Sequence, residues 1–281
     1  MRPDKPLEGG RLLVYRHPAV VRITHWLNLL SLVVLLLSGL QILCSHPAFY
    51  WGETARFAAP FAAIVSEIGP QGEPRGLLTA PGVRLDTTGL LGASRNAEGL
   101  MTSRAIPHWL TLPRELDLGA GRRWHFFFAW LFVLNGALYL ATGLISRRLR
   151  RELVPSRDQL AHLGAAIGDH LRLKFPRGEA ARRYNVLQKL TYLPVVFILL
   201  PLMVLTGLAM SPAVDARIPL AMMLGGRQTA RTLHFLCASG LVGFVVVHVV
   251  MVILAGPVNE LRSMITGWFV IKPEQPEEDA P

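Results

Sequence analysis

The fold of this chain is decided by residues 231–256, which read RTLHFLCASGLVGFVVVHVVMVILAG. No charged residue follows Arg231 until Glu260, so the run is long enough to cross a bilayer core, which takes about 20 apolar residues. Two histidines, His234 and His248, interrupt the run. An ionisable side chain inside a membrane segment is costly and marks a candidate functional site.

The spacing of these two histidines predicts what they do. Fourteen helical residues at roughly 100° each make four turns less about 40°, so both imidazoles face the same side, roughly 21 Å apart along the axis. One helix therefore offers one nitrogen ligand near each membrane face. Haem iron commonly takes histidine as an axial ligand. Two haems stacked across a membrane need two further histidines, at matching depths on other helices.

The composition agrees with a membrane protein. The chain has 281 residues, of which 51% are hydrophobic and only 17% are charged. Its two cysteines, Cys44 and Cys237, lie in apolar segments without metal-motif spacing, so each is expected to be a small buried hydrophobe. The net charge is +10, and the basic residues cluster in a few segments, as they do in the cytoplasmic loops of membrane proteins. No nucleic-acid partner is therefore expected.

Four segments have the length and hydropathy of membrane spans. The first follows a basic start, as a signal peptide does, but it is too long and lacks a small-residue cleavage site, so we expect a retained anchor. The third contains Pro194 and Pro201, which membrane helices tolerate when neighbours satisfy the freed backbone groups. We expect one all-α, four-helix membrane domain over residues 1–281, with spans at about 23–44, 124–146, 190–210 and 232–256.

The connections between the spans differ in charge and length. Residues 45–121 are rich in Gly and Pro and nearly balanced in charge, and loops this long are usually functional or disordered. Within them, 57–68 is too short to span and is expected to lie at the interface as a short helix, and 106–113 looks like a second ordered patch. We expect part of this loop to dock a partner.

The remaining polar segments lie after the second and fourth spans. Residues 147–184 carry ten Arg or Lys against four acids, and 160–175 have a weak helical pattern that predicts a surface helix. An amphipathic piece runs over 258–270, and the acidic tail 272–281 is expected to be disordered.

The charge asymmetry sets the topology. The N-terminal segment and the 147–184 loop are basic, so the positive-inside rule places both termini in the cytoplasm and 45–121 outside. His25 then lies near the cytoplasmic face, as His248 does, while His125 lies near the outer face, as His234 does. Depth pairs His25 with His248 and His125 with His234. Each pair predicts one six-coordinate haem, which favours electron transfer over oxygen chemistry.

Other residues are weaker candidates. Arg22, Arg122 and Arg123 could pair haem propionates, or serve equally as topology signals and interface anchors. Small residues could let a macrocycle approach the helices or simply allow close helix packing; they are Ser38, Gly39, Gly136, Gly143, Gly207, Gly240 and Gly243. The histidines outside the spans are expected mostly to be solvated or to cap loops; they are His17, His46, His108, His162 and His170.

Several motifs resemble the four-helix dihaem cytochrome b family, which includes bacterial b561 cytochromes and the membrane subunits of nickel–iron hydrogenases, formate dehydrogenases and thiosulfate reductases. RITHWLNLLSLVVLLLSGLQI (22–42) resembles its first helix, RYNVLQKLTY (183–192) the start of its third, and LHF…VVVHV its fourth. HPAFYWGE (46–53), HWLTLP (108–113) and GRRWHFFFAWLFVLNGALYL (121–140) look most like the thiosulfate reductase branch.

The resemblance implies two b haems that carry electrons between membrane quinone and an outer partner, in the bacterial inner membrane. The family's quinone-site asparagine matches Asn185, and Gln188 and Lys189 lie in the same motif; polar capping of the helix is the alternative. A periplasmic molybdopterin oxidoreductase is the implied partner. The 45–121 loop is longer than a hydrogenase or formate dehydrogenase subunit needs, and the chain lacks motifs for substrate chemistry of its own.

Two other classes stay open. A stand-alone b561-type quinone oxidoreductase, such as a superoxide oxidase, would act without a partner. A haem-free transporter or scaffold would show no Soret absorbance and would leave four depth-matched histidines unexplained.

Overall fold

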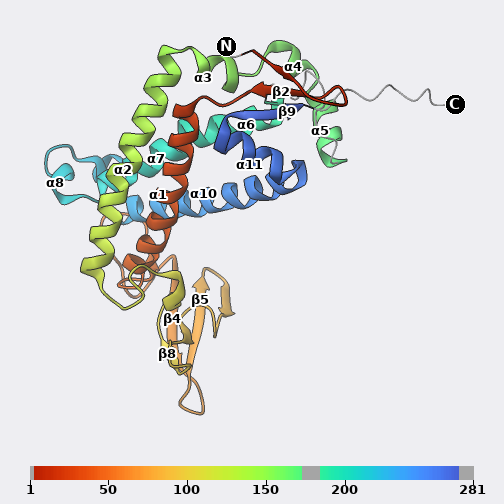
Figure 1. The fold of residues 1–281 in the computed structure, drawn as a ribbon. Helices are drawn as coiled ribbons and strands as arrows, with labels where there is room; N and C mark the ends of the chain where they lie inside the picture. Colours follow the sequence, from red (N-terminus) through yellow and green to blue (C-terminus); the bar gives the residue numbers. More distant parts are fainter. Residues whose placement is uncertain (1–2, 173–183, 272–281) are drawn as a thin grey trace. The chain divides into compact units, whose positions relative to one another are not determined.

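A computed structural model describes residues 3–172 and 184–271 (Figure 1). The chain divides into two compact units, which are described separately. Unit 1 comprises Met1–Leu27, Asn135–Leu200 and Gly240–Pro281, and unit 2 comprises Asn28–Leu134 and Pro201–Ser239.

Within the described residues, four helices are long and apolar enough to cross a membrane: α1 (Ala19–Leu43), α2 (Leu118–Ile145), the helix over Val186–Ala209, and α10 (Arg227–Ala255). Each helix begins several residues before its predicted span, because the charged residue directly before each span is itself helical; these residues are Arg22, Arg123, Lys189 and Arg231. Only 11–22% of their most apolar windows is buried within the protein, so most of that apolar surface is available to lipid.

The third of these helices changes its winding between Pro194 and Pro201, whereas the sequence indicated only that the helix tolerates both prolines. α6 (Val186–Pro194) leads into a π-helical turn, η3 (Val195–Leu199), and then into α7 (Leu200–Ala209). Proline has no N–H to donate and crowds the turn before it. The π-helical turn η3 is the turn that precedes Pro201, so its wider backbone makes room for that ring.

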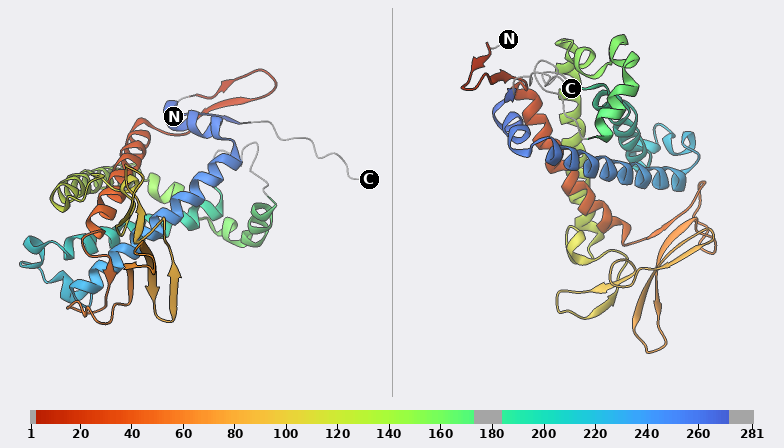
Figure 2. Two further views of the ribbon diagram at one scale, coloured as in Figure 1. Left: turned by 90° about the horizontal axis from the view of Figure 1, so that it is seen from below. Right: turned by 90° about the vertical axis from the view of Figure 1, so that its right-hand side faces the viewer.

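The connection from α1 to α2 in unit 2 is folded into strands (orange to yellow in Figure 2). One antiparallel sheet has the order β3-β4-β5-β6, and a separate hairpin pairs β7 with β8. The strands are β3 (Ala48–Phe49), β4 (Ala62–Ile68), β5 (Pro74–Ala80), β6 (Val83–Asp86), β7 (Ala93–Arg95) and β8 (Met101–Ser103). The prediction of an all-α chain is therefore wrong in this region.

The predicted interface helix over 57–68 is also wrong, because its second half is β4. The β-branched Ile64 and Val65 favour a pleated strand, and a turn containing Gly72, at φ +80°, folds the chain back so that Val65 pairs with Leu77. Leu43 at the end of α1 packs with Phe49, Ile64 and Ile106 into a buried cluster.

The predicted ordered patch at 106–113 is confirmed. It contains a 3-10 turn, η1 (His108–Leu110), and Ile106 at its start is buried. Elsewhere in unit 2, α8 (Pro212–Asp215) and α9 (Leu220–Met223) connect α7 to α10.

In unit 1 the two ends of the described chain pair with each other. β1 (Lys5–Pro6), β2 (Leu12–Tyr15) and β9 (Trp268–Ile271) form one sheet, and β2 and β9 lie side by side in Figure 1. The amphipathic segment predicted over 258–270 is helical only in α11 (Pro257–Thr266), because Gly267, at φ +89°, ends the helix and starts β9. The tail 272–281 lies outside the described residues.

The basic connection in unit 1 is helical where it is described. α3 (Arg148–Leu153), α4 (Arg157–Ala161) and α5 (Leu163–Leu171) follow one another. The predicted surface helix over 160–175 is thus two helices separated at His162, and its last residues lie outside the described chain.

Two histidine pairs as candidate ligand sites

Each unit contains one pair of facing histidines. In unit 2, His125 of α2 and His234 of α10 have ring centroids 6.2 Å apart at an interplanar angle of 64°. In unit 1, His25 of α1 and His248 of α10 have ring centroids 6.4 Å apart at 63°. The structure therefore brings together the same histidines that depth matching paired.

These separations fit one metal ion between two imidazoles. A metal–imidazole bond of about 2 Å, plus about 1.1 Å from the nitrogen to the ring centre, gives roughly 6.2 Å between two rings on opposite sides of one ion. Two imidazoles in direct van der Waals or hydrogen-bond contact can bring their ring centres closer together than this. Both pairs thus fit the two axial positions of a haem iron.

The surroundings of His125 fix which of its nitrogens can act as a ligand. Its Nδ1 lies 3.1 Å from the hydroxyl of Ser38 on α1. That hydroxyl has one proton, which it donates to the carbonyl of Val34 at 2.6 Å, so it accepts from the Nδ1–H of His125. The lone pair of Nε2 then remains for a metal.

His234 is held by the same device from another helix. Thr206 of α7 donates its proton to the carbonyl of Leu202 at 2.8 Å and lies 3.0 Å from Nδ1 of His234. A glycine follows each hydroxyl residue: a Cβ at Gly39 would lie 3.3 Å from Cε1 of His125, and one at Gly207 would lie 3.3 Å from Cε1 of His234. Each hydroxyl–glycine pair therefore orients one ring and makes room for it.

The histidines of unit 1 have aromatic neighbours instead. His248 stacks with Phe244 at 5.9 Å and 19°, and His25 meets the edge of Trp26 at 5.5 Å. Within residues 3–172 and 184–271, neither imidazole has a hydrogen bond to a side chain or to the backbone.

The arginines predicted for propionates differ in their contacts. Arg22 donates to the carbonyl of Ile265, while its Nε is buried without a partner among the described residues. Arg122 lies over the ring of Phe126 at 5.6 Å, and Arg123 is exposed. An orphaned Nε–H at Arg22 is the feature that best fits a carboxylate acceptor.

The predicted quinone residues have structural partners at the start of α6. Asn185 and Gln188 form a reciprocal capping box, with their side-chain oxygens accepting backbone N–H groups at 2.8 and 3.1 Å. Lys189 is buried and donates to the carbonyl of Val154 and to Gln159. The capping alternative is therefore observed, while the amide NH₂ groups of Asn185 and Gln188 have no partner in the described chain.

The segment 46–53 packs against the start of α10, next to His234. Phe49 lies against Phe235 at 4.4 Å, and Thr232 donates to the carbonyl of Tyr50 at 2.8 Å. Arg231 donates to the carbonyls of His46 and Ala48. Sequence analysis missed this attachment, as it missed Thr206, because neither has a periodic or spacing signal.

The prediction for His17 is also wrong. It was expected to be solvated, but only 4% of it is exposed, and its Nδ1 has no partner among the described residues. Burial, reinforced by the charges of Arg16 and Arg148, lowers the pKa of His17 from 6.5 to about 3.

The helices and the two sites together define a helical, multi-pass membrane protein with paired histidines suited to haem. A family model described as prokaryotic cytochrome b561 matches residues 16–267, and the chain belongs to this family of haem b membrane electron-transfer proteins. The chain is also 30% identical, over 251 residues, to the putative protein-methionine-sulfoxide reductase subunit YedZ1 of Azospira oryzae. That match covers 89% of this chain and 96% of the relative. No solved structure matches the chain.

Proposed function

We propose that the chain carries electrons across the bacterial inner membrane between quinone and a reductase, using two b haems. His25 with His248, and His125 with His234, would hold the irons. The observation that carries this proposal is the pair of ring separations, 6.4 and 6.2 Å, each of which fits one iron. The basic N-terminal segment and the basic α3–α5 connection support cytoplasmic termini.

A haem iron supplies one-electron chemistry when it is bound. Two histidines would hold each iron, so the sites would suit electron transfer and would leave no position for a substrate. Ser38 and Thr206 hold two of the ligands in one tautomer, with Nε2 available. Substrate chemistry then belongs to a partner.

The partner is proposed to dock beside His234. Segment 46–53 is bonded to the first turns of α10, and Trp51, Phe57 and Phe61 near it are 47%, 76% and 43% exposed. Exposed aromatic side chains are typical anchors of protein interfaces. The relative from Azospira is named a subunit of a protein-methionine-sulfoxide reductase. The proposed partner is a periplasmic reductase of that kind. It would carry a molybdopterin cofactor, as the resemblance to the thiosulfate reductase branch implies.

Quinone is proposed to bind at the start of α6 in unit 1, the unit that also contains His25 and His248. The amide NH₂ groups of Asn185 and Gln188 can donate to quinone carbonyls while their oxygens maintain the capping box. Lys189 would add a positive charge and keep this end of the helix attached to Gln159.

Two substitutions at one position separate quinone binding from capping. Asn185→Ala removes both the cap and the amide donor, whereas Asn185→Ser keeps a good N-cap and replaces the amide NH₂ by a shorter hydroxyl that no longer reaches as far. We expect both variants to retain their haem. Quinol should reduce that haem several-fold more slowly than in the wild type, as measured by stopped-flow absorbance. If Asn185→Ser is reduced as fast as the wild type, Asn185 only caps the helix and the quinone lies elsewhere.

A further inference from the structure

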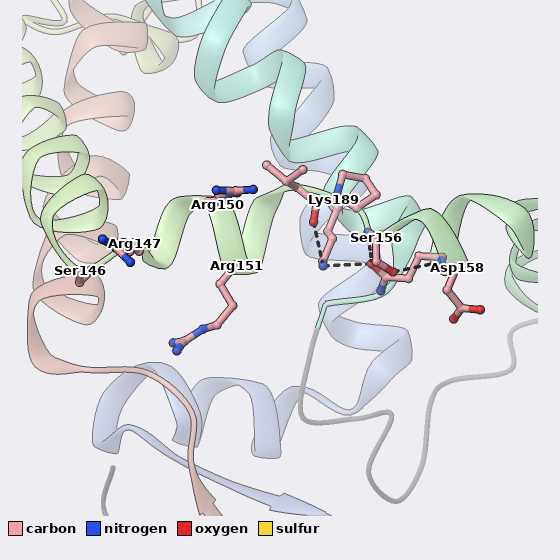
Figure 3. A pocket seen from close by; sticks show the side chains of 10 residues that line it. Ser146, Arg147, Arg150, Arg151, Ser156, Asp158 and Lys189 are labelled. Atoms are coloured by element: carbon pink, nitrogen blue, oxygen red, sulfur yellow. Dashed lines mark hydrogen bonds between the residues drawn. The ribbon is translucent and has the colours of Figure 1, made fainter.

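A cavity of about 740 Å³ lies in unit 1 between the end of α2 and the start of α6. Arg147, Arg150 and Arg151 line one end of it, and Ser156, Asp158 and Lys189 line the other (Figure 3). Four of these six side chains are cationic and one is anionic. The Asp158 carboxylate lies 3.5 Å from His162 and is 84% exposed, so it opposes an anion only weakly.

Two of the three arginines that line this cavity have no partner for their guanidinium groups among the described residues, whereas Arg151 lies 3.5 Å from Glu152. Within residues 3–172 and 184–271, the guanidinium groups of Arg147 and Arg150 have neither an ion pair nor a hydrogen bond. By contrast, Arg148 between them pairs with Glu152 at 3.0 Å and donates to the carbonyl of Arg16. The two cations left over therefore face the cavity with their binding capacity available.

The backbone at Arg147 gives a second, independent observation. Its φ of +55° is left-handed, a conformation that costs non-glycine residues free energy and that clusters at functional sites. This residue lies between α2 and α3 and caps the start of α3, and Arg147 and Arg150 both line the same cavity.

Exposed apolar residues in the cavity wall, and at the end of α2 directly before the lining residue Ser146, indicate where the ligand comes from. Leu144 and Ile145, the last residues of the spanning helix α2, are 66% and 85% exposed, and Val154 in the cavity wall is 49% exposed. A phosphate bound by the arginines would thus have an apolar surface beside it, suited to acyl chains. Basic pockets next to membrane helices match the head groups of anionic lipids.

We propose that this cavity binds the phosphate head group of an anionic phospholipid of the surrounding membrane. Arg147 and Arg150 would contact the phosphate oxygens, and Leu144 and Ile145 would contact the acyl chains. Lys189 already donates to Val154 and Gln159, so it forms the far wall and supplies long-range charge. A neutral quinone ring has no use for two unpaired guanidinium groups, so the charge favours the lipid.

Native mass spectrometry of the purified, haem-loaded full chain in detergent tests this proposal. Dioleoyl phosphatidylglycerol and dioleoyl phosphatidylcholine are added in separate titrations. We expect the wild type to bind the anionic lipid about tenfold more tightly, and Arg147→Gln/Arg150→Gln to lose that preference. Arg11→Gln/Arg262→Gln removes the same charge from exposed sites outside the cavity and should keep it.

Each other outcome overturns the proposal. Equal binding of the two lipids, or equal loss in the cavity and control variants, would show that general charge accounts for binding. Displacement of the lipid by millimolar inorganic phosphate would assign the site to a soluble anion, and displacement by short-chain ubiquinone would assign it to quinone. Arg150→Glu, on an exposed helix face, serves as the cavity variant if the double variant does not fold, with the Soret spectrum as the check.

Discussion

The two histidine pairs have almost the same ring separation but different supports. The unit 2 pair is held by Ser38 and Thr206 through Nδ1, with a glycine after each hydroxyl residue. The unit 1 pair is flanked by Trp26 and Phe244, without a hydrogen bond from either ring in the described chain. The ring separation therefore does not distinguish the two pairs, whereas the side chains that contact the histidines do.

The different supports would give the two proposed haem sites different properties. A hydrogen bond from Nδ1–H fixes the ring and makes Nε2 more basic, which favours the ferric iron. The unit 2 site is therefore expected to be the more rigid, and the unit 1 site the more adaptable. An adaptable site suits the end at which quinone is proposed to bind.

The largest effect is expected from removing a ligand. His234→Ala should remove the haem of unit 2 and His248→Ala that of unit 1, so that each variant keeps about half of the haem, because a haem with one axial histidine is held weakly. Haem content per chain and the reduced-minus-oxidised spectrum measure this. Full haem content in either variant would show that the pairing is wrong.

Bulk at the supporting glycines should act on one pair only. Gly207→Val places methyl groups against His234, whose Cε1 would lie 3.3 Å from a Cβ, and should displace the ring and lower haem occupancy in unit 2. Gly168→Val, at a helix position with open space around a Cβ, is the matched control. Equal haem loss in both variants would attribute the effect to helix propensity.

Removing a hydroxyl is expected to have a smaller effect. Thr206→Val keeps the shape and deletes the acceptor for Nδ1–H, so haem retention in unit 2 should weaken by roughly tenfold, the low end for such partners, and the midpoint potential should rise. Thr191→Val removes an exposed hydroxyl that bonds only to Leu187 of its own helix, and should change neither quantity. A potential unchanged in Thr206→Val would mean that the hydroxyl only fills space.

The smallest effect is expected on the stability of the fold in acid, through His17, which belongs to neither histidine pair. Burial lowers the pKa of His17 from 6.5 in the unfolded chain to about 3 in the folded protein. The unfolded chain therefore binds the proton first, and the free energy of unfolding falls as the pH drops below 6.5, by roughly 1.4 kcal/mol at pH 5.5. His17→Gln should flatten thermal stability between pH 6.5 and 4. His162→Gln, at a largely exposed histidine, is the control, and equal slopes in all three proteins would contradict the account.

The membrane helices and the pairing could be predicted because they depend on long-range regularities of the sequence. Apolar length predicts a span, basic loops predict its direction, and direction predicts depth, which was enough to match His25 with His248. The π-helical turn between Pro194 and Pro201 was not predicted, because the sequence indicated only that a membrane helix tolerates these prolines.

The supporting groups and the strands could not be predicted in the same way. Thr206 bonds to its own helix backbone, as many membrane threonines do, so only the rotation of α7 in the folded unit shows that it also meets His234. The 57–68 segment lacks a clear period, and only the hairpin turn at Gly72 decides in favour of β4. Turn residues were the signal available there.

Haem stoichiometry tests the central proposal most directly. Purified full-length protein, from cells well supplied with haem, is assayed by pyridine haemochrome against protein concentration. The proposal predicts two b haems per chain, one for each histidine pair. One haem per chain would show that one pair is structural, and none would contradict the proposal for both.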